Sequence, residues 1–263
     1  MSEWSSKWLL KFHPDKCKHM VIGNSNRPNP EYKLKTLDHE HIISTVENEK
    51  DIGVIIDSRL QFDEHINEKI NKAVKASAMI RRTFEFLNEK NFGPLYKSLV
   101  RCHLDTASSV WHPYKKKHVI ALENVQRRAT KQLPGFKDLS YTERLKCLRL
   151  PSLAYRRERG DMIEVFKMVH GLYNPRVIDF LVKSEIIEGR PETTGHSHKL
   201  FLQQSNKDIR KYSFALRVVK VWNSLPTDVV NAPSIDAFKR CLDKYRANQA
   251  ILNDFEERLT TGS

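Results

Sequence analysis

Several common signatures are missing from this sequence of 263 residues. It contains no Gly-x-Gly-x-x-Gly stretch, no P-loop and no Gly-x-Ser-x-Gly elbow, and its nine glycines are scattered singly. These absences argue against a dinucleotide fold, a P-loop NTPase and an α/β-hydrolase. No apolar run approaches the roughly 18 residues that a bilayer-spanning helix needs, so no membrane partner is expected.

Paired acidic residues are missing as well. Two-metal phosphoryl transfer needs convergent carboxylates that hold two ions about 4 Å apart, yet no Asp-Asp pair occurs in the chain. The alternating series His13, Asp15, Cys17 and His19 could line one face of a strand and bind a metal. Pro14 interrupts that series and no second ligand cluster has a fitting spacing. A solvated strand face is therefore favoured, and no metal site is assigned.

The four cysteines are also isolated, since no Cys-x-x-Cys pair occurs. This spacing indicates reduced thiols rather than a disulfide framework. The N-terminus lacks the layout of a signal peptide. Together these features predict a soluble intracellular protein, cytoplasmic or nuclear.

Positive charge is what the sequence has in excess. Lys and Arg number 45 against 32 Asp and Glu, which gives a net charge of +13 and a pI near 9.5. Such an excess favours a polyanionic partner, because each phosphate neutralised by a basic side chain releases condensed counterions. Hydrophobic residues make up 40% of the chain, which is typical of a globular protein.

Residue periodicity changes along the chain. Residues 1–60 indicate short strands, with alternation over 32–37 and a β-branched run over 54–56. From Phe62 the apolar residues recur at spacings of three and four, which predicts a helix to Phe84. Further helices are expected from Pro94 towards Trp111, over 118–132, from a capping box at Ser140–Glu143 to residue 150, from Ser152 to Gly171, over 212–224 and after Ser234. Leu200–Arg210 is expected to form a short strand pair.

Two N-terminal stretches carry a family resemblance. Residues 8–20 read Trp-Leu-Leu-Lys-Phe-His-Pro-Asp-Lys-Cys-Lys-His-Met, and residues 51–60 read Asp-Ile-Gly-Val-Ile-Ile-Asp-Ser-Arg-Leu. Together they resemble the last two blocks of the palm in reverse transcriptases of non-LTR (LINE, jockey-like) retrotransposons. Residues 80–84, 95–101, 107–111, 123–131 and 150–157 are similar to the thumb of these enzymes, and residues 222–226 and 234–245 to their carboxyl-terminal region.

The resemblance implies a mainly α fold with a small β portion. Residues 1–60 would be a remnant of the palm with β-hairpins, and residues 61–182 a helical thumb-like bundle. Residues 183–199 are polar, contain Gly and Pro, and are interpreted as a linker. Residues 200–263 would form a small α+β C-terminal region. Pro94 departs from the family pattern, which keeps a continuous helical segment there.

The resemblance also assigns roles to residues in the first 60 positions. Lys16 would lie near the phosphates of the incoming nucleotide, but only in a complete palm. Ile52, Gly53 and Val54 resemble the primer-grip hairpin, and His13 replaces the usual Asn. The family's Tyr/Phe-Ala-Asp-Asp turn, which binds the catalytic Mg²⁺, does not occur in this sequence. We therefore expect an upstream polymerase segment to be missing, no catalytic residue and no cofactor in this chain, and no polymerisation by the chain alone.

Basic clusters recur on the expected helices and predict binding to RNA or DNA through the phosphate backbone. The candidate residues are Lys72, Lys75, Arg81, Arg82, Lys115, Lys116, Lys117, Arg127, Arg128, Lys131, Arg156, Arg157 and Arg159. The alternative is that arginines of these clusters form internal ion pairs with Glu123, Glu143, Glu158 and Asp161.

Two other interpretations remain open from the sequence. The chain could be an adapted protein-interaction module that kept the fold, or a decayed retroelement product without activity. Unpaired strand edges in residues 1–60 also predict self-association.

Overall fold

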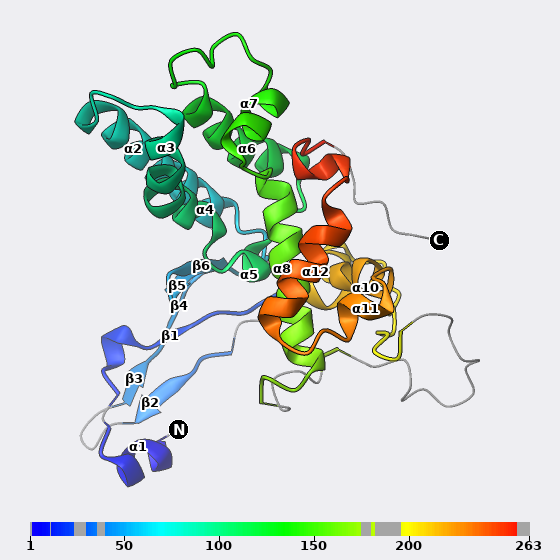
Figure 1. Ribbon diagram of the computed structural model, residues 1–263. Helices are drawn as coiled ribbons and strands as arrows, with labels where there is room; N and C mark the ends of the chain where they lie inside the picture. Colours follow the sequence, from blue (N-terminus) through cyan, green and yellow to red (C-terminus); the bar gives the residue numbers. More distant parts are fainter. Residues whose placement is uncertain are drawn as a thin grey trace. The chain divides into compact units, whose positions relative to one another are not determined.

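The computed structural model describes residues 2–10, 12–23, 30–35, 40–174, 180–181 and 196–256. The chain divides into two compact units, residues 1–65 and residues 66–263. The first contains all the described strands that pair into sheets, and the second is helical (Figure 1). This confirms the expectation of a mainly α fold with a small β portion.

The first unit is built from three separate two-stranded sheets. β1 (Lys18–His19) pairs in parallel with β4 (Ser44–Thr45). β2 (Lys33–Lys35) pairs antiparallel with β3 (Glu40–Ile42), and β5 (Asn48–Asp51) with β6 (Val54–Asp57). A helix, α1 (Ser2–Trp8), and a 3₁₀ turn, η1 (Pro14–Lys16), precede the strands. The buried side chains described in this unit are Leu34, Val54 and His65, so its core is small.

The loop from β6 into α2 (Asp63–Thr83) is shaped by one carboxylate. Oδ1 of Asp57 accepts hydrogen bonds from the amides of Arg59 at 3.0 Å and Gln61 at 3.1 Å, and Oδ2 accepts one from Phe62 at 2.6 Å. Phe62 has a φ of 57°, a conformation that needs such support in a residue other than glycine. The Asp57 carboxylate therefore fixes the start of α2.

The helical unit is arranged around α8 (Leu153–Val169), which contacts α4, α5, α6, α10, α12 and η5 (Figure 1). Its other elements are α3 (Glu89–Leu95), the π-helical segment η2 (Tyr96–Arg101), α4 (Cys102–Asp105), α5 (Ser108–Trp111), α6 (Lys116–Thr130), α7 (Tyr141–Leu148), α9 (Asp208–Lys211), α10 (Phe214–Asn223), α11 (Thr227–Val230), α12 (Ile235–Arg246) and the 3₁₀ turn η5 (Ala250–Leu252). Phe166 of α8 stacks on Phe238 of α12 at 4.4 Å between ring centroids, and Trp222 of α10 lies 6.1 Å from the same ring.

Three helix starts follow the expected capping. The Ser140 hydroxyl accepts from the amide of Glu143, while the Glu143 carboxylate accepts from the amide of Ser140, which is the reciprocal capping box. Ser152 caps α8 by accepting from Tyr155, and Ser234 caps α12 by accepting from Ala237. These local predictions are confirmed because a cap depends on residues within one turn of each other.

The expected helix start at Pro94 is wrong. The helix begins at Glu89, because Asn88 and Asn91 form a capping box six residues earlier in the chain. Pro94 lies inside a helical segment that continues to Asp105. Proline has no N–H for the bond to the carbonyl four residues back, and the π-helical segment η2 follows directly.

The expected strand pair over Leu200–Arg210 is also wrong. Leu200 makes an isolated bridge, and residues 208–211 are the helix α9. The backbone of Leu200 pairs instead with the Asn223 side chain, which accepts from its N–H at 2.9 Å and donates to its C=O at 2.8 Å. A side-chain amide thus provides the partners that a second strand would have supplied.

The C-terminal helices share one hydrophobic core with α8. Met162, Val165 and Phe166 of α8 pack in a buried cluster with Trp222 and Phe238. Of the expected linker over 183–199, residues 183–195 lie outside the described residues. Its last residues are packed: His196 is buried, and the indole N–H of Trp222 donates to the carbonyl of His198 at 2.8 Å.

Hydrogen exchange should distinguish the two units. We expect the amides of β3 to β6 to exchange at least about tenfold faster than those of α8 and of α2 beyond Ile66. The reason is that the strand unit buries few side chains, whereas the helical unit buries many. Exchange followed by mass spectrometry of peptides measures both in one sample. Equal protection of the two regions would contradict the small core assigned to residues 1–65.

Candidate nucleic-acid interface

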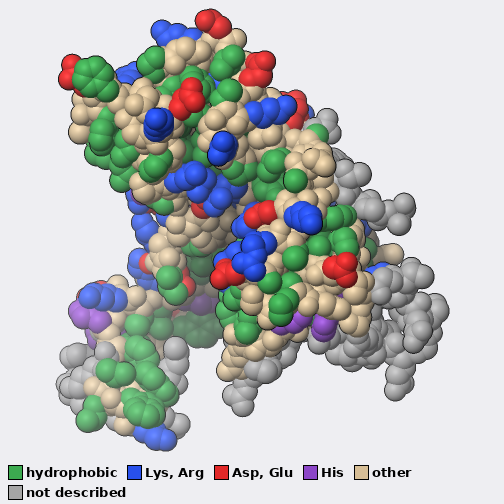
Figure 2. Space-filling model, viewed as in Figure 1, with side chains coloured by type: hydrophobic (Ala, Val, Ile, Leu, Met, Phe, Trp, Pro, Cys, Tyr) green, Lys and Arg blue, Asp and Glu red, His purple; other side chains and the backbone are tan. Residues whose placement is uncertain are grey.

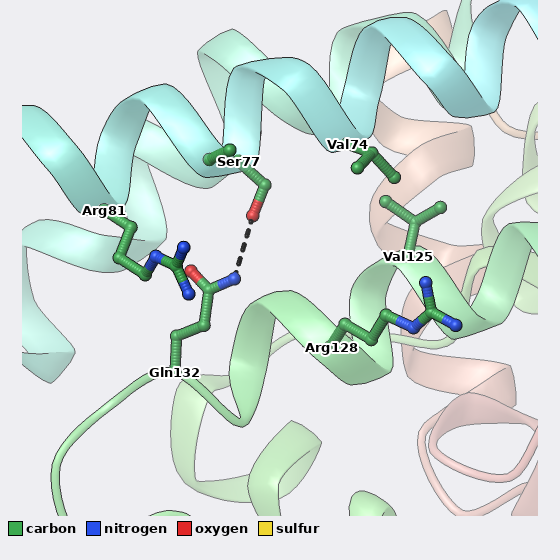
Figure 3. A pocket seen from close by; sticks show the side chains of 7 residues that line it. Val74, Ser77, Arg81, Val125, Arg128 and Gln132 are labelled. Carbon is green, nitrogen blue, oxygen red and sulfur yellow. Dashed lines mark hydrogen bonds between the residues drawn. The ribbon is translucent and has the colours of Figure 1, made fainter.

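A groove between α2 and α6 brings two predicted basic residues together. It is a pocket of about 190 Å³, lined on α2 by Val74, Ser77, Ala78 and Arg81, and from α6 onward by Val125, Arg128 and Gln132. Val74 and Val125 face each other across it, and the two arginines lie at different positions along the same groove (Figure 3). The amide of Gln132 donates to the Ser77 hydroxyl at 3.5 Å. Polar and apolar contacts thus hold the two helices side by side.

Further predicted residues extend the charge beside this groove. Arg81, Arg82, Lys75 on α2 and Arg128 and Lys131 at the end of α6 are all exposed. Among the described residues none of these five forms an ion pair. Long, unpaired cationic side chains on two adjacent helices are suited to contacts with phosphates.

The remaining basic residues of α2 and of the start of α6 differ in their surroundings. Lys72 pairs with Glu68 at 2.5 Å, one turn earlier on α2. Lys116 and Lys117 are exposed, and the ammonium of Lys115 lies 5.9 Å from the centre of the Tyr114 ring. On the face shown in Figure 2, Lys and Arg side chains are interspersed with Asp and Glu rather than gathered in a single patch.

Arg127 is packed against aromatic rings. Its guanidinium carbon lies 5.1 Å from the centre of the Tyr141 ring and 5.4 Å from that of Phe255. Cation–π contacts of this kind hold the side chain against the protein. Arg127 is therefore placed apart from its neighbour Arg128, whose side chain lines the groove.

The arginines of α8 do not lie on the predicted binding surface. Arg156 pairs with Asp105 at 2.7 Å, and Arg159 forms a two-pronged pair with Asp243 at 2.5 and 2.7 Å. Arg157 is 2% exposed. Of the residues predicted to contact phosphates, these three therefore lie apart from the α2–α6 groove, because acidic residues from distant parts of the chain pair with two of them and the third is buried.

Glu123 is a buried acid whose carboxylate interacts with the charge of Arg157. The sequence indicates it only as one possible internal partner of the basic clusters. It accepts from the Tyr141 hydroxyl at 2.6 Å and from the amide of Leu153 at 3.1 Å to each oxygen. Burial raises the pKa of Glu123, while the Tyr141 hydrogen bond and the Arg157 charge oppose that rise. The carboxylate joins α6 to the first turn of α8.

A second buried acid, Asp161, has partners that the sequence did not indicate. Nε and Nη2 of Arg217 donate to its two oxygens at 2.9 and 3.0 Å, and Nδ1 of His112 lies 3.2 Å away. Although burial acts to raise it, His112 and Arg217 hold the pKa of Asp161 below its ordinary value. Burial lowers the pKa of His112 to about 4, so this histidine is neutral at pH 7.

The primer-grip-like residues form the turn of the β5–β6 hairpin. Asp51 pairs with Val54, which leaves Ile52 and Gly53 as a two-residue turn with φ angles of 44° and 82°. Two successive positive φ angles are typical of a type I′ turn, where a β-branched residue is strained. Ile52 is 96% exposed at the tip, whereas Val54 is buried. Lys16 is exposed at the end of η1.

Asp57 and Asp15, two acidic residues of the first unit, have different surroundings. The Asp57 carboxylate accepts the three backbone N–H bonds of the loop before α2, and the Asp15 side chain is 90% exposed. Over the described ranges the structure contains no cluster of three or more His, Cys, Asp or Glu residues suited to a metal ion.

Comparison with protein-family models, with curated proteins and with solved structures found no match to this chain. Among its described helices none is long and apolar enough to cross a membrane.

The stability of the helical unit should depend on pH through Glu158 of α8. Burial raises the pKa of Glu158 to about 7 from 4.5, and its Oε2 is inaccessible to solvent although the residue is partly exposed. Folding therefore favours the protonated form, and the stability that this group contributes below pH 4.5 is lost as the pH rises towards 7. Through Glu158, the free energy of unfolding should decrease by roughly 2–3 kcal/mol as the pH rises from below 4.5 to above 7.

Urea denaturation between pH 4.5 and pH 8 measures this effect. Glu158→Gln should remove this group's contribution, so that stability falls less with rising pH than in the wild type, and Glu85→Gln, at an exposed position, should keep it. The same pH dependence in wild type and Glu158→Gln would show that another group is responsible.

Proposed function

We propose that this protein binds RNA or DNA without sequence specificity, through backbone phosphates, on the surface formed by α2 and α6. The observation that carries the proposal is the groove into which Arg81 of α2 and Arg128 of α6 both extend (Figure 3). Arg82 directly follows Arg81 and Lys131 lies three residues after Arg128, and both side chains are exposed. Four cationic side chains with no ion-pair partner among the described residues would follow a polyanionic strand along the two helices.

The likeness of the sequence to non-LTR retrotransposon reverse transcriptases supports the same partner. On this proposal, residues 1–60 correspond to the end of the palm and the helices that follow to the thumb, which in a polymerase contacts the template–primer duplex. In a complete palm with bound Mg²⁺, the turn at Ile52 and Gly53 would approach a primer end, and Lys16 would approach the phosphates of an incoming nucleotide. The chain itself would bind but not polymerise.

A second candidate function, from the class of protein-interaction modules, is favoured by apolar exposure along the second half of α2 and just after it. Val74 and Met79 are 40% and 50% exposed, and Phe84 and Phe86 are 39% and 80% exposed. Several large exposed apolar side chains close together in the sequence are typical of a protein contact. The two candidates predict different responses to salt, since an apolar contact releases no counterions.

The groove can be tested with the double variant Arg81→Ala and Arg128→Ala. Affinity for a mixed-sequence single-stranded oligonucleotide should fall about tenfold, and the slope of log K against log salt should decrease by about one to two units, since two phosphate contacts are lost. Fluorescence anisotropy at several salt concentrations measures both quantities.

The matched control is Lys220→Ala with Arg240→Ala, which removes the same charge from exposed positions of α10 and α12. This control should keep most of the affinity and the salt slope. Equal losses in the two double variants would mean that net charge alone, and not the groove, determines binding.

Polymerase activity provides a separate test. We expect no primer extension by the purified protein on an RNA template with Mg²⁺ or Mn²⁺, because the sequence contains no Asp-Asp pair to hold the two ions. Gel electrophoresis of a labelled primer after incubation with all four deoxynucleotides measures this. Extension that disappears in Asp57→Asn or Asp15→Asn would overturn the proposal.

A further inference from the structure

A larger pocket lies between α7, α8, the end of α12 and η5. Its volume is about 620 Å³, within the range of small-molecule sites. The cationic side chains in its lining are Lys146, Arg149, Arg156 and Arg159, against the single carboxylate of Asp243. A pocket with this excess of positive charge favours an anionic ligand.

Two of the four cations are held in place by ion pairs. Nε and Nη2 of Arg156 engage Asp105 at 2.8 and 2.7 Å, and the same two nitrogens of Arg159 engage Asp243 at 2.5 and 2.7 Å. Each guanidinium keeps Nη1 as a further donor, and its orientation is set before a ligand arrives. Such preorganisation reduces the entropic cost of binding.

The other two cations are exposed at the pocket. Lys146 lies in the last turn of α7, and Arg149 follows the helix with a φ of 50°, in the left-handed region. Neither forms an ion pair among the described residues. A phosphate contacted by an unpaired Lys and an unpaired Arg would gain charge-assisted hydrogen bonds without breaking an existing pair.

Apart from Asn253, the rest of the lining is mostly apolar, and hydrogen bonds of Ser152 hold it to η5. Leu145, Leu150, Pro151 and Leu252 contribute to it, together with the ring of Tyr155. Ser152 fixes this wall by donating from its amide to the carbonyl of Leu252 at 2.8 Å and from its hydroxyl to that of Ile251 at 2.7 Å. An apolar wall beside a cationic rim suits a ligand that joins a planar, weakly polar group to an anion.

We propose that this pocket binds a phosphate monoester attached to a nucleoside, with the phosphate on Lys146 and Arg149 and the base against Leu150, Pro151 and Leu252. The site is separate from the α2–α6 groove and does not rest on the function proposed above. A free nucleoside monophosphate and the 5′-phosphorylated end of a nucleic-acid strand both carry this chemistry.

Isothermal titration calorimetry with AMP, adenosine and inorganic phosphate tests the ligand class. AMP should bind at least about tenfold more tightly than either fragment, because each fragment forfeits the contacts of one part of the pocket. Absence of AMP binding, or binding of adenosine as tight as that of AMP, would overturn the proposal. Phosphate binding as tight as that of AMP would overturn the assignment of the apolar wall to a base.

The double variant Lys146→Gln with Arg149→Gln tests the location. It should weaken AMP binding about tenfold or more and change the melting temperature little, since both side chains lack ion pairs among the described residues. The control is Lys220→Gln with Arg240→Gln, which removes the same charge from exposed positions outside both sites and should leave AMP affinity unchanged. AMP affinity equal in wild type and the Lys146/Arg149 variant would exclude this pocket.

Matched oligonucleotides with a 5′-phosphate or a 5′-hydroxyl distinguish the two sources. A preference for the phosphorylated strand that is lost in the Lys146/Arg149 variant identifies a strand end as the ligand. AMP binding without that preference identifies a free nucleotide. Either result supports the pocket, and both are independent of the salt slope that tests the groove.

Discussion

The carboxylate of Glu123 is the contact on which the helical unit depends. It lies at the N-terminus of α8, where it accepts from the amide of Leu153, and it is fully buried. A negative charge at this end of a helix is favoured by the unpaired N–H groups and the helix dipole. Arg157, one helical turn further, adds an opposite charge that opposes the cost of burying Glu123.

This arrangement determines where the other elements can pack. α8 contacts helices from both ends of the helical unit, so its position sets those of α6, α10 and α12 together. A buried charge that loses its opposite charge typically costs about 3–5 kcal/mol. The position of one buried acid therefore affects both the core around Trp222 and Phe238 and the pocket beside η5.

The charge of the protein serves two different purposes. On α8, Arg156 pairs with Asp105 and Arg159 pairs with Asp243, while the charge of Arg157 interacts with that of Glu123. These arginines contribute to packing. By contrast, five basic side chains on α2 and at the end of α6 are exposed, and there the excess charge is available to a partner: Lys75, Arg81, Arg82, Arg128 and Lys131. A net charge of +13 is thus compatible with a binding surface much smaller than the number of basic residues suggests.

Local signals in the sequence determined much of the secondary structure. The capping box at Ser140 and Glu143 and the caps at Ser152 and Ser234 place three helix starts correctly, because each depends on atoms within one turn. The predicted start at Pro94 is wrong, because the capping box of Asn88 and Asn91 starts the helix at Glu89 and leaves Pro94 inside it. Which arginines face solvent could not be determined from the sequence. Arg128 and Arg159 both lie on basic helices, and only the tertiary structure brings Asp243, 84 residues away, against Arg159 while leaving Arg128 in a groove. An ion pair depends on the distance between side chains in the folded protein, and spacing along the chain does not contain that distance.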